Sequence, residues 1–162
     1  MRNRSAIVDA GPIFSLAVID KLQILDQVFN QVTIPRAVWK EITLDKTTTF
    51  YNLIETYFKT KIVDIKGFNE LTFVMDYGES ESVILYKELN ADFLLIDDKK
   101  ARNIAENFNV RCVGTLGVLS KAKEAGMIEH LRPIFMSLIK KDRYFSLRLL
   151  NTLLDKYHEQ KI

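Results

Sequence analysis

Short apolar runs alternate with segments of helical periodicity along this chain. The runs are too short for helices and predict strands, which we place at residues 6–8, 31–34, 61–65, 93–96 and 110–113. Between them, apolar residues recur with the helical repeat, and three more helices are expected after the last strand. The order β-α-α-β-α-α-β-α-β-α-β-α-α-α predicts an α/β fold: a three-layer α/β/α sandwich with a central, mostly parallel sheet and a helical C-terminal tail.

Two of the predicted strands end in carboxylates. Asp9 follows the first strand, and Asp97 and Asp98 follow the fourth. Parallel sheets place their working residues at the carboxyl ends of strands, so these acids are expected at one edge. Glu79, at the start of a helix, and Glu41, on the helix after the second strand, can reach the same place.

Each acid also has a purely structural interpretation. Asp9 can form an Asx turn or a helix cap, and either Asp97 or Asp98 can be the N-cap of the next helix. Glu79 can complement a helix dipole, and Glu41 can be an ordinary exposed residue. Taken together, the carboxylates would repel one another unless a divalent cation lay between them. Oxygen ligands without His or Cys favour Mg²⁺ or Mn²⁺.

The bulk properties suit one globular domain. The chain has 162 residues, 48% of them hydrophobic, and we expect a single domain over 1–162, with a core at about 5–125 and C-terminal helices at 131–158. No apolar run is long enough to cross a bilayer, and only a short strand follows the basic N-terminus, so we expect neither membrane contact nor a secretory signal. The single Cys112 excludes an intramolecular disulfide, and a cytoplasmic protein is expected.

Charge is unevenly distributed along the chain. Residues 1–95 hold ten Lys and Arg against thirteen Asp and Glu, a net −3, whereas the remainder holds thirteen against eight, a net +5. Lys99, Lys100 and Arg102 follow the paired aspartates and either offer a basic face to a polyanion or form a solvated helix face. Thr115, between glycines at a helix start, either holds a phosphate or caps the helix.

Five motifs, in this order, resemble a PIN domain and are most similar to the VapC-type toxins of bacteria and archaea. The resemblance extends from Ile7 to about Leu154. The motifs are Ile-Val-Asp-Ala-Gly-Pro-Ile (7–13), Ile-Pro-Arg-Ala-Val-Trp-Lys-Glu (34–41), Tyr-Gly-Glu-Ser-Glu-Ser (77–82), Leu-Ile-Asp-Asp-Lys-Lys-Ala-Arg (95–102) and Gly-Thr-Leu-Gly-Val-Leu (114–119).

The resemblance implies a role for each acid. Asp9, Glu41 and Glu79 match the first three acids of the family, although many members have Asp in the third position. Either Asp97 or Asp98 matches the fourth. All five are candidate catalytic residues, and all except Glu41 are candidate metal ligands. The chain departs from the pattern at residue 11, a glycine where many toxins have a Ser or Thr that helps to order a metal-bound water.

The same resemblance implies an activity and partners. We expect a Mg²⁺- or Mn²⁺-dependent endoribonuclease that leaves a 5′-phosphate and a 3′-hydroxyl. For such an enzyme, the candidates for contacting the RNA backbone are Lys99, Lys100, Arg102 and Thr115. We also expect it to be the toxin of a toxin–antitoxin pair, with a small antitoxin protein and a homodimeric assembly. The alternative is a catalytically weak or inactive PIN domain that binds RNA or a partner. A phospho-acceptor signalling domain, which also uses acids at strand ends, fits the spacing less well.

Overall fold

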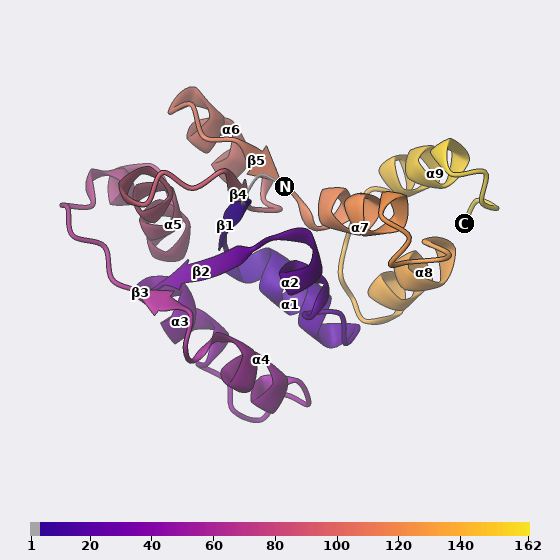
Figure 1. Ribbon diagram of the computed structural model, residues 1–162, viewed down its shortest axis with the longest axis horizontal. Coiled ribbons are helices and arrows are strands. Elements are labelled where there is room, and N and C mark those ends of the chain that lie inside the picture. The colour runs from indigo at the N-terminus through magenta and orange to yellow at the C-terminus, as the bar shows by residue number, and fades with distance from the viewer. Residues whose placement is uncertain (1–3) are drawn as a thin grey trace.

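The computed structural model of the protein describes residues 4–162, and the first three residues of the basic N-terminus lie outside them (Figure 1). The elements follow the predicted order. The strands are β1 (Ser5–Val8), β2 (Gln31–Pro35), β3 (Ile62–Val63), β4 (Phe93–Leu95) and β5 (Cys112–Val113). The helices are α1 (Ala10–Val18), α2 (Ile24–Val28), α3 (Arg36–Ile42), α4 (Tyr51–Phe58), the 3-10 turn η1 (Glu70–Phe73), α5 (Tyr77–Glu88), α6 (Lys99–Asn107), α7 (Thr115–Glu124), α8 (Arg132–Lys140) and α9 (Leu147–Lys156).

The five strands form one parallel sheet in the order β3-β2-β1-β4-β5. From β1 the chain first adds β2 and β3 on one side, then returns to add β4 and β5 on the other. The direction of winding therefore reverses between β1 and β4, and in open α/β sheets ligands bind at the carboxyl ends of the strands at such a switch point. Val8 pairs with Leu95, and Leu95 pairs with Val113, so the ends of β1, β4 and β5 lie level with one another.

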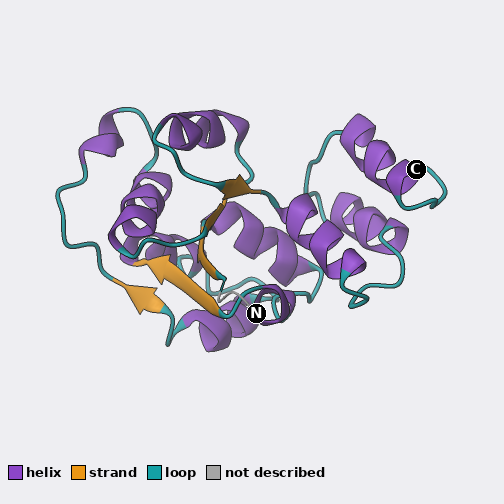
Figure 2. Ribbon diagram, turned by 45° about the horizontal axis from the view of Figure 1, so that its top comes forward, coloured by secondary structure: helices purple, strands orange, loops and turns teal. Residues whose placement is uncertain are grey.

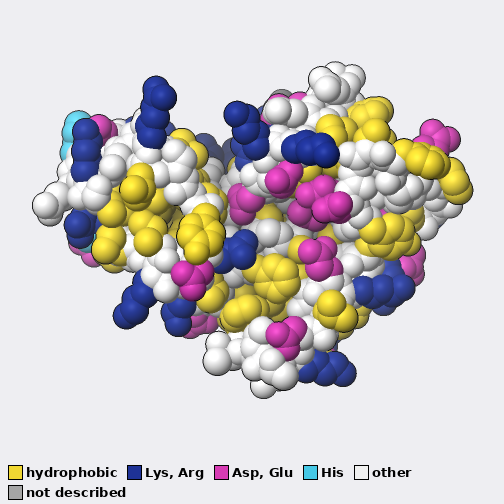
Figure 3. Space-filling model, turned by 180° about the vertical axis from the view of Figure 1, so that it is seen from behind, with side chains coloured by type: hydrophobic (Ala, Val, Ile, Leu, Met, Phe, Trp, Pro, Cys, Tyr) yellow, Lys and Arg dark blue, Asp and Glu magenta, His cyan; other side chains and the backbone are white. Residues whose placement is uncertain are grey.

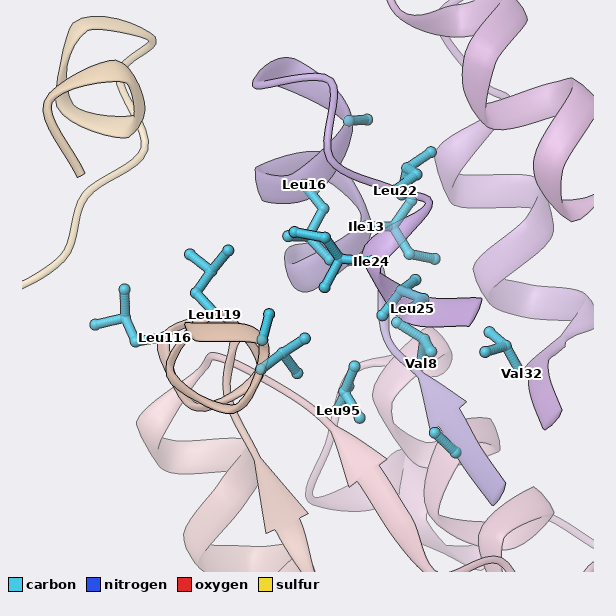
Figure 4. Close-up of a cluster of buried hydrophobic side chains, with 14 of the residues drawn as sticks. Val8, Ile13, Leu16, Leu22, Ile24, Leu25, Val32, Leu95, Leu116 and Leu119 are labelled. Carbon is cyan, nitrogen blue, oxygen red and sulfur yellow. The ribbon is translucent and has the colours of Figure 1, made fainter. Parts of the chain in front are cut away.

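Side chains alternate between two cores, one on each face of the sheet. Ile7 and Leu94 pack beneath α5 and α6, whereas Val8 and Leu95 point to the opposite face. There they meet apolar residues of α1, α2 and α7, as Figure 4 shows. The near-continuous apolar strands follow from this burial on both faces, which confirms the predicted α/β/α layering.

The C-terminal helices extend the second core away from the sheet. In Figures 1 and 2, α8 and α9 lie at the opposite end of the molecule from β3. Phe135 and Leu150 anchor them in the core shared with α1 and α7. Arg143, between α8 and α9, donates hydrogen bonds to Ser15 Oγ (2.9 Å) and to the Gly11 carbonyl (3.2 Å), which ties the tail to α1.

The observed elements differ from the prediction mainly at their ends. β3, predicted over 61–65, is only two residues long, and the connection between β3 and α5 contains η1. Along residues 4–162, no helix is both long and apolar enough to cross a lipid bilayer.

Candidate active site

Asp9 lies at the centre of the site, immediately after β1. Its backbone N–H donates to the Leu95 carbonyl (2.9 Å), which joins it to β4. Only 6% of the residue is exposed, and its buried Oδ1 has no hydrogen-bond partner. Burial, together with the charges of Glu79, Glu41 and Asp97, raises the pKa of the Asp9 carboxyl to about 7. A buried carboxylate oxygen without a donor is costly, and a cation would relieve that cost.

Asp97 lies at the end of β4, on the same edge of the sheet. Its carboxylate accepts hydrogen bonds from the Thr115 backbone N–H (2.7 Å) and the Thr115 hydroxyl (2.6 Å). On its other side it faces α1, where a Cβ added to Gly11 would lie 3.8 Å from Asp97 Cβ and 3.9 Å from Oδ2. Asp97 is therefore directed between β1 and β5, towards the inner part of the site.

Asp98 has a different environment. It is the N-cap residue of α6, and its Oδ1 accepts a hydrogen bond from the Ala101 backbone N–H (2.8 Å). The side chain is exposed, but its charge contributes to raising the pKa of Glu79. The two aspartates that the sequence left equivalent are thus an inner acid, Asp97, and a helix-capping acid at the rim, Asp98.

Glu79 approaches from the first turn of α5. Its Oε2 accepts a hydrogen bond of 3.3 Å from the Asp76 backbone N–H, the longest of the bonds that hold these acids. Partial burial and the charges of Asp76, Asp98 and Glu41 raise the pKa of the Glu79 carboxyl. This is the dipole-complementing position that the sequence allowed, and it also places the carboxylate beside the others.

Glu41 reaches the site from α3 because residue 78 is a glycine. A Cβ added to Gly78 would lie 2.9 Å from Glu41 Oε2, 3.6 Å from Val38 Cγ2 and 3.9 Å from Asp9 Oδ1. The bare backbone of α5 thus lets the two carboxylates approach each other. Burial, with a smaller contribution from the charge of Asp76, raises the pKa of the Glu41 carboxyl.

The acids lie in one region, but among the residues that the structure describes they do not form a preformed set of metal ligands. Figure 3 shows Asp and Glu side chains gathered in a hollowed part of one face, with Lys and Arg side chains beside them. Within residues 4–162, no three Asp, Glu, His or Cys side chains are arranged as a ready ligand group. Asp97, Asp98 and Glu79 instead each accept a hydrogen bond from a donor elsewhere in the protein. A donor set of carboxylate oxygens, one of them buried and unpaired, fits a hard divalent cation.

The family model described as a PIN domain matches residues 5–159 of the chain. The chain belongs to the PIN-domain family. A search of curated proteins gives no match. PIN domains are generally nucleases and typically use divalent metals, which agrees with a site made of carboxylates at the switch point of a parallel sheet.

Thr115 of this PIN domain has a role that sequence reasoning missed. The tentative RNA contact was wrong, because the side chain is fully buried and its hydroxyl donates to Asp97. Thr115 is also not the helix cap, since Gly114 occupies that position of α7. The signal was present in the strand alignment: Leu95 pairs with Val113, and Asp97 and Thr115 each follow two residues later.

Arg102 supports the site from within. Its Nη2 donates to the Ile96 carbonyl (2.8 Å), and a Cβ added to Gly114 would lie 2.5 Å from that nitrogen and 3.0 Å from Asp97 Oδ1. Gly114 therefore leaves room for a guanidinium close to Asp97. Lys99 and Lys100 are exposed beside Asp98. RNA contact by Arg102 and these two lysines stays a prediction.

Proposed function

We propose that this PIN domain is an endoribonuclease that depends on Mg²⁺ or Mn²⁺. The observation that carries the proposal is the buried, unpaired Oδ1 of Asp9. Burial first, and then the charges of the neighbouring acids, raise the pKa of the Asp9 carboxyl to about 7. A site built only to stabilise the fold would give that oxygen a donor. The cation that PIN domains typically use would offset this clustered negative charge.

Asp9, Asp97 and Glu79 would hold the cation, with Asp98 at the rim. When bound, the cation supplies Lewis acidity, which lowers the pKa of water and offsets negative charge on a phosphate. Thr115 keeps Asp97 oriented through its two hydrogen bonds. Ligands fixed in this way lose less conformational freedom on binding.

Glu41 is the carboxylate best suited to accept a proton. Its raised pKa and its position next to Asp9 give it the properties of a general base. Glu41 would take the proton from a water molecule that attacks the RNA phosphorus. The P–O3′ bond breaks and the leaving O3′ takes up a proton from solvent water, so the products carry a 5′-phosphate and a 3′-hydroxyl.

The biological setting is proposed from the resemblance to VapC-type toxins. It includes an RNA substrate, a small antitoxin protein that covers the acids, a homodimer and a cytoplasmic location. Lys99 and Lys100, exposed at the start of α6, would contact the RNA backbone. The domain would comprise the whole chain, residues 1–162.

Cleavage of labelled RNA by the purified protein in Mn²⁺ tests the proposal. We expect 5′-phosphate ends from the wild type and a loss of at least about a hundredfold in rate for Asp9→Asn and Asp97→Asn, as for removal of groups that act together at a catalytic centre. Glu129→Gln is a matched control, since Glu129 is an exposed acid in the loop before α8. Equal cleavage by Asp9→Asn and Glu129→Gln would refute the proposal.

One observation favours a second candidate, an inactive RNA-binding or partner-binding domain. Asp97, Asp98 and Glu79 already hold internal hydrogen bonds, and residue 11 lacks a hydroxyl. If the chain were such a module, it would bind RNA without metal, with an affinity that falls steeply as salt is added and without any turnover.

A further inference from the structure

An open groove leads away from the acids between η1 and α6. Two adjoining cavities form it, with volumes of about 390 and 580 Å³. Glu79 and Asp98 line the first cavity, and Phe108 lines the second. The residues that line both are Phe73, Val74, Lys100 and Ile104. The groove is therefore continuous from the acidic site to the far end of α6.

The walls of this groove carry large apolar side chains that the fold leaves wholly or partly exposed. Phe73 is 88% exposed and Phe108 is 44% exposed. Burying a Phe side chain contributes about 1.5–3 kcal/mol, so Phe73 contributes little to folding in this position. Exposed apolar side chains grouped beside a functional site are typical of a binding surface.

We propose that this groove holds an unpaired base of a single-stranded RNA, stacked on Phe73, next to the phosphate at the acids. The inference rests on the proposed nuclease function and adds to it a residue, Phe73, that would contact a base beside the cleavage site. A duplex keeps its bases stacked inside the helix and offers none to Phe73.

The charges along the groove match a nucleotide chain. At one end, Glu79 and Asp98 would meet a phosphate only through a cation. Lys100, which lines both cavities, offers its ammonium group to the neighbouring phosphate. Beyond it, the Phe73 ring provides a stacking face, and Asn107 provides a donor and an acceptor for a base edge. An apolar protein segment in the same groove would leave Lys100 and Asn107 without matching groups.

Binding of a short labelled oligouridylate in Mn²⁺ tests the inference. All proteins carry Asp9→Asn, which stops turnover and removes one repelling charge. In this background we expect Phe73→Ala to weaken binding roughly tenfold or more, as expected for the loss of one base–aromatic stack. Phe73→Tyr should restore the affinity. Phe68→Ala is the matched control, because Phe68 is 82% exposed in the same loop and lines neither cavity.

An abasic oligomer of the same length separates base contacts from backbone contacts. We expect the protein with Phe73 to bind it more weakly than oligouridylate, and the Phe73→Ala protein to bind both equally. Equal affinities of Phe73→Ala and Phe68→Ala for oligouridylate would overturn the inference. The inference would also be overturned if the Phe73→Ala protein no longer bound a co-purifying protein but kept the wild-type affinity for oligouridylate.

The two proposals fail in different ways. If the chain with Asp9 intact cleaves RNA and Phe73→Ala leaves both cleavage and binding unchanged, only the groove is refuted. If oligouridylate binding depends on Phe73 but the intact chain never cleaves, the nuclease proposal is refuted and the base-binding groove is supported.

Discussion

Thr115 donates two hydrogen bonds to Asp97, one from its backbone N–H at 2.7 Å and one from its hydroxyl at 2.6 Å. Asp97 follows the end of β4 by two residues and Thr115 begins α7 after β5, so the pair links the segments after two neighbouring strands at the candidate active site. Because Thr115 is fully buried, its hydroxyl serves Asp97 rather than solvent. A residue in this position would fix the orientation of Asp97 if that carboxylate binds a metal.

We therefore expect Thr115→Val to lower Mn²⁺ affinity or RNA cleavage by about 10- to 100-fold, the usual effect of removing a partner of a metal ligand. Valine keeps the shape but removes the hydroxyl donor, whereas Thr115→Ser retains it and should restore most of the loss. Calorimetric titration with Mn²⁺ and single-turnover cleavage rates provide the measurement. A Thr115→Val protein equal to the wild type in both would show that Asp97 does not need this bond.

The pKa of Asp9 predicts how stability depends on pH in the absence of divalent cations. The carboxyl has an ordinary pKa of 3.8, raised to about 7 in the folded protein, so the folded state binds more protons than the unfolded state between these values. The free energy of unfolding should fall as pH rises through that window, by at most about 4 kcal/mol from Asp9. Urea unfolding in EDTA from pH 4 to pH 8 measures this slope.

Asp9→Asn is the control for that slope. Asparagine cannot ionise, so the variant should lose less stability over the same pH range than the wild type, and it should be the more stable protein at pH 8. Glu41 and Glu79, whose pKa values are also raised, leave a residual slope in both proteins. Parallel stability curves for the two proteins would mean that the pKa of Asp9 is not raised in the folded protein.

Two helical glycines of the site should respond differently to alanine. A Cβ at Gly78 would lie 2.9 Å from Glu41 Oε2 and must displace it, whereas a Cβ at Gly11 makes ordinary contacts with Asp97. Gly78→Ala should reduce RNA cleavage while the protein stays folded. Gly11→Ala should stabilise the protein by up to about 1 kcal/mol, because alanine favours the helix. Urea unfolding and cleavage rates, measured on both, would show whether this contrast holds.

Arg143 should contribute to the attachment of the C-terminal helices. Its guanidinium donates to the buried Ser15 hydroxyl and to the Gly11 carbonyl in α1. Arg143→Ala removes both donors, and we expect a loss of about 1–3 kcal/mol, the range for hydrogen bonds to charged groups. Hydrogen exchange of α8 and α9 should accelerate more than that of the sheet. Unchanged exchange in these helices would show that their packing alone holds them.

The sequence predicted the order of elements because that order depends on local patterns. Ile7 and Val8, for example, are both apolar because each is buried in a core, one on each face of the sheet. The rule that acids follow strands was enough to bring Asp9 and Asp97 to one edge. Glu79, at a helix start, and Glu41, on a neighbouring helix, were also within predicted reach, and their carboxylates contribute to the raised pKa of Asp9.

The roles that sequence reasoning missed depend on contacts between elements far apart in the chain. Asp97 and Asp98 are adjacent in sequence, and only the pairing of β4 with β5 separates the inner acid from the helix cap. The same pairing turns Thr115 towards Asp97. Pro35 is the last residue of β2, where it pairs with Val63, and it is also the N-cap residue of α3. No local pattern contains these pairings.

Titration of Mn²⁺ into the wild type and Asp9→Asn, followed by electron paramagnetic resonance, tests the central claim most directly. The account predicts that the wild type takes up Mn²⁺ at pH 8, with binding that weakens as the pH falls below about 7, where Asp9 is protonated. Asp9→Asn should bind at least about tenfold more weakly. Equal binding by the two proteins, or none by either, would contradict the claim that these carboxylates form a cation site.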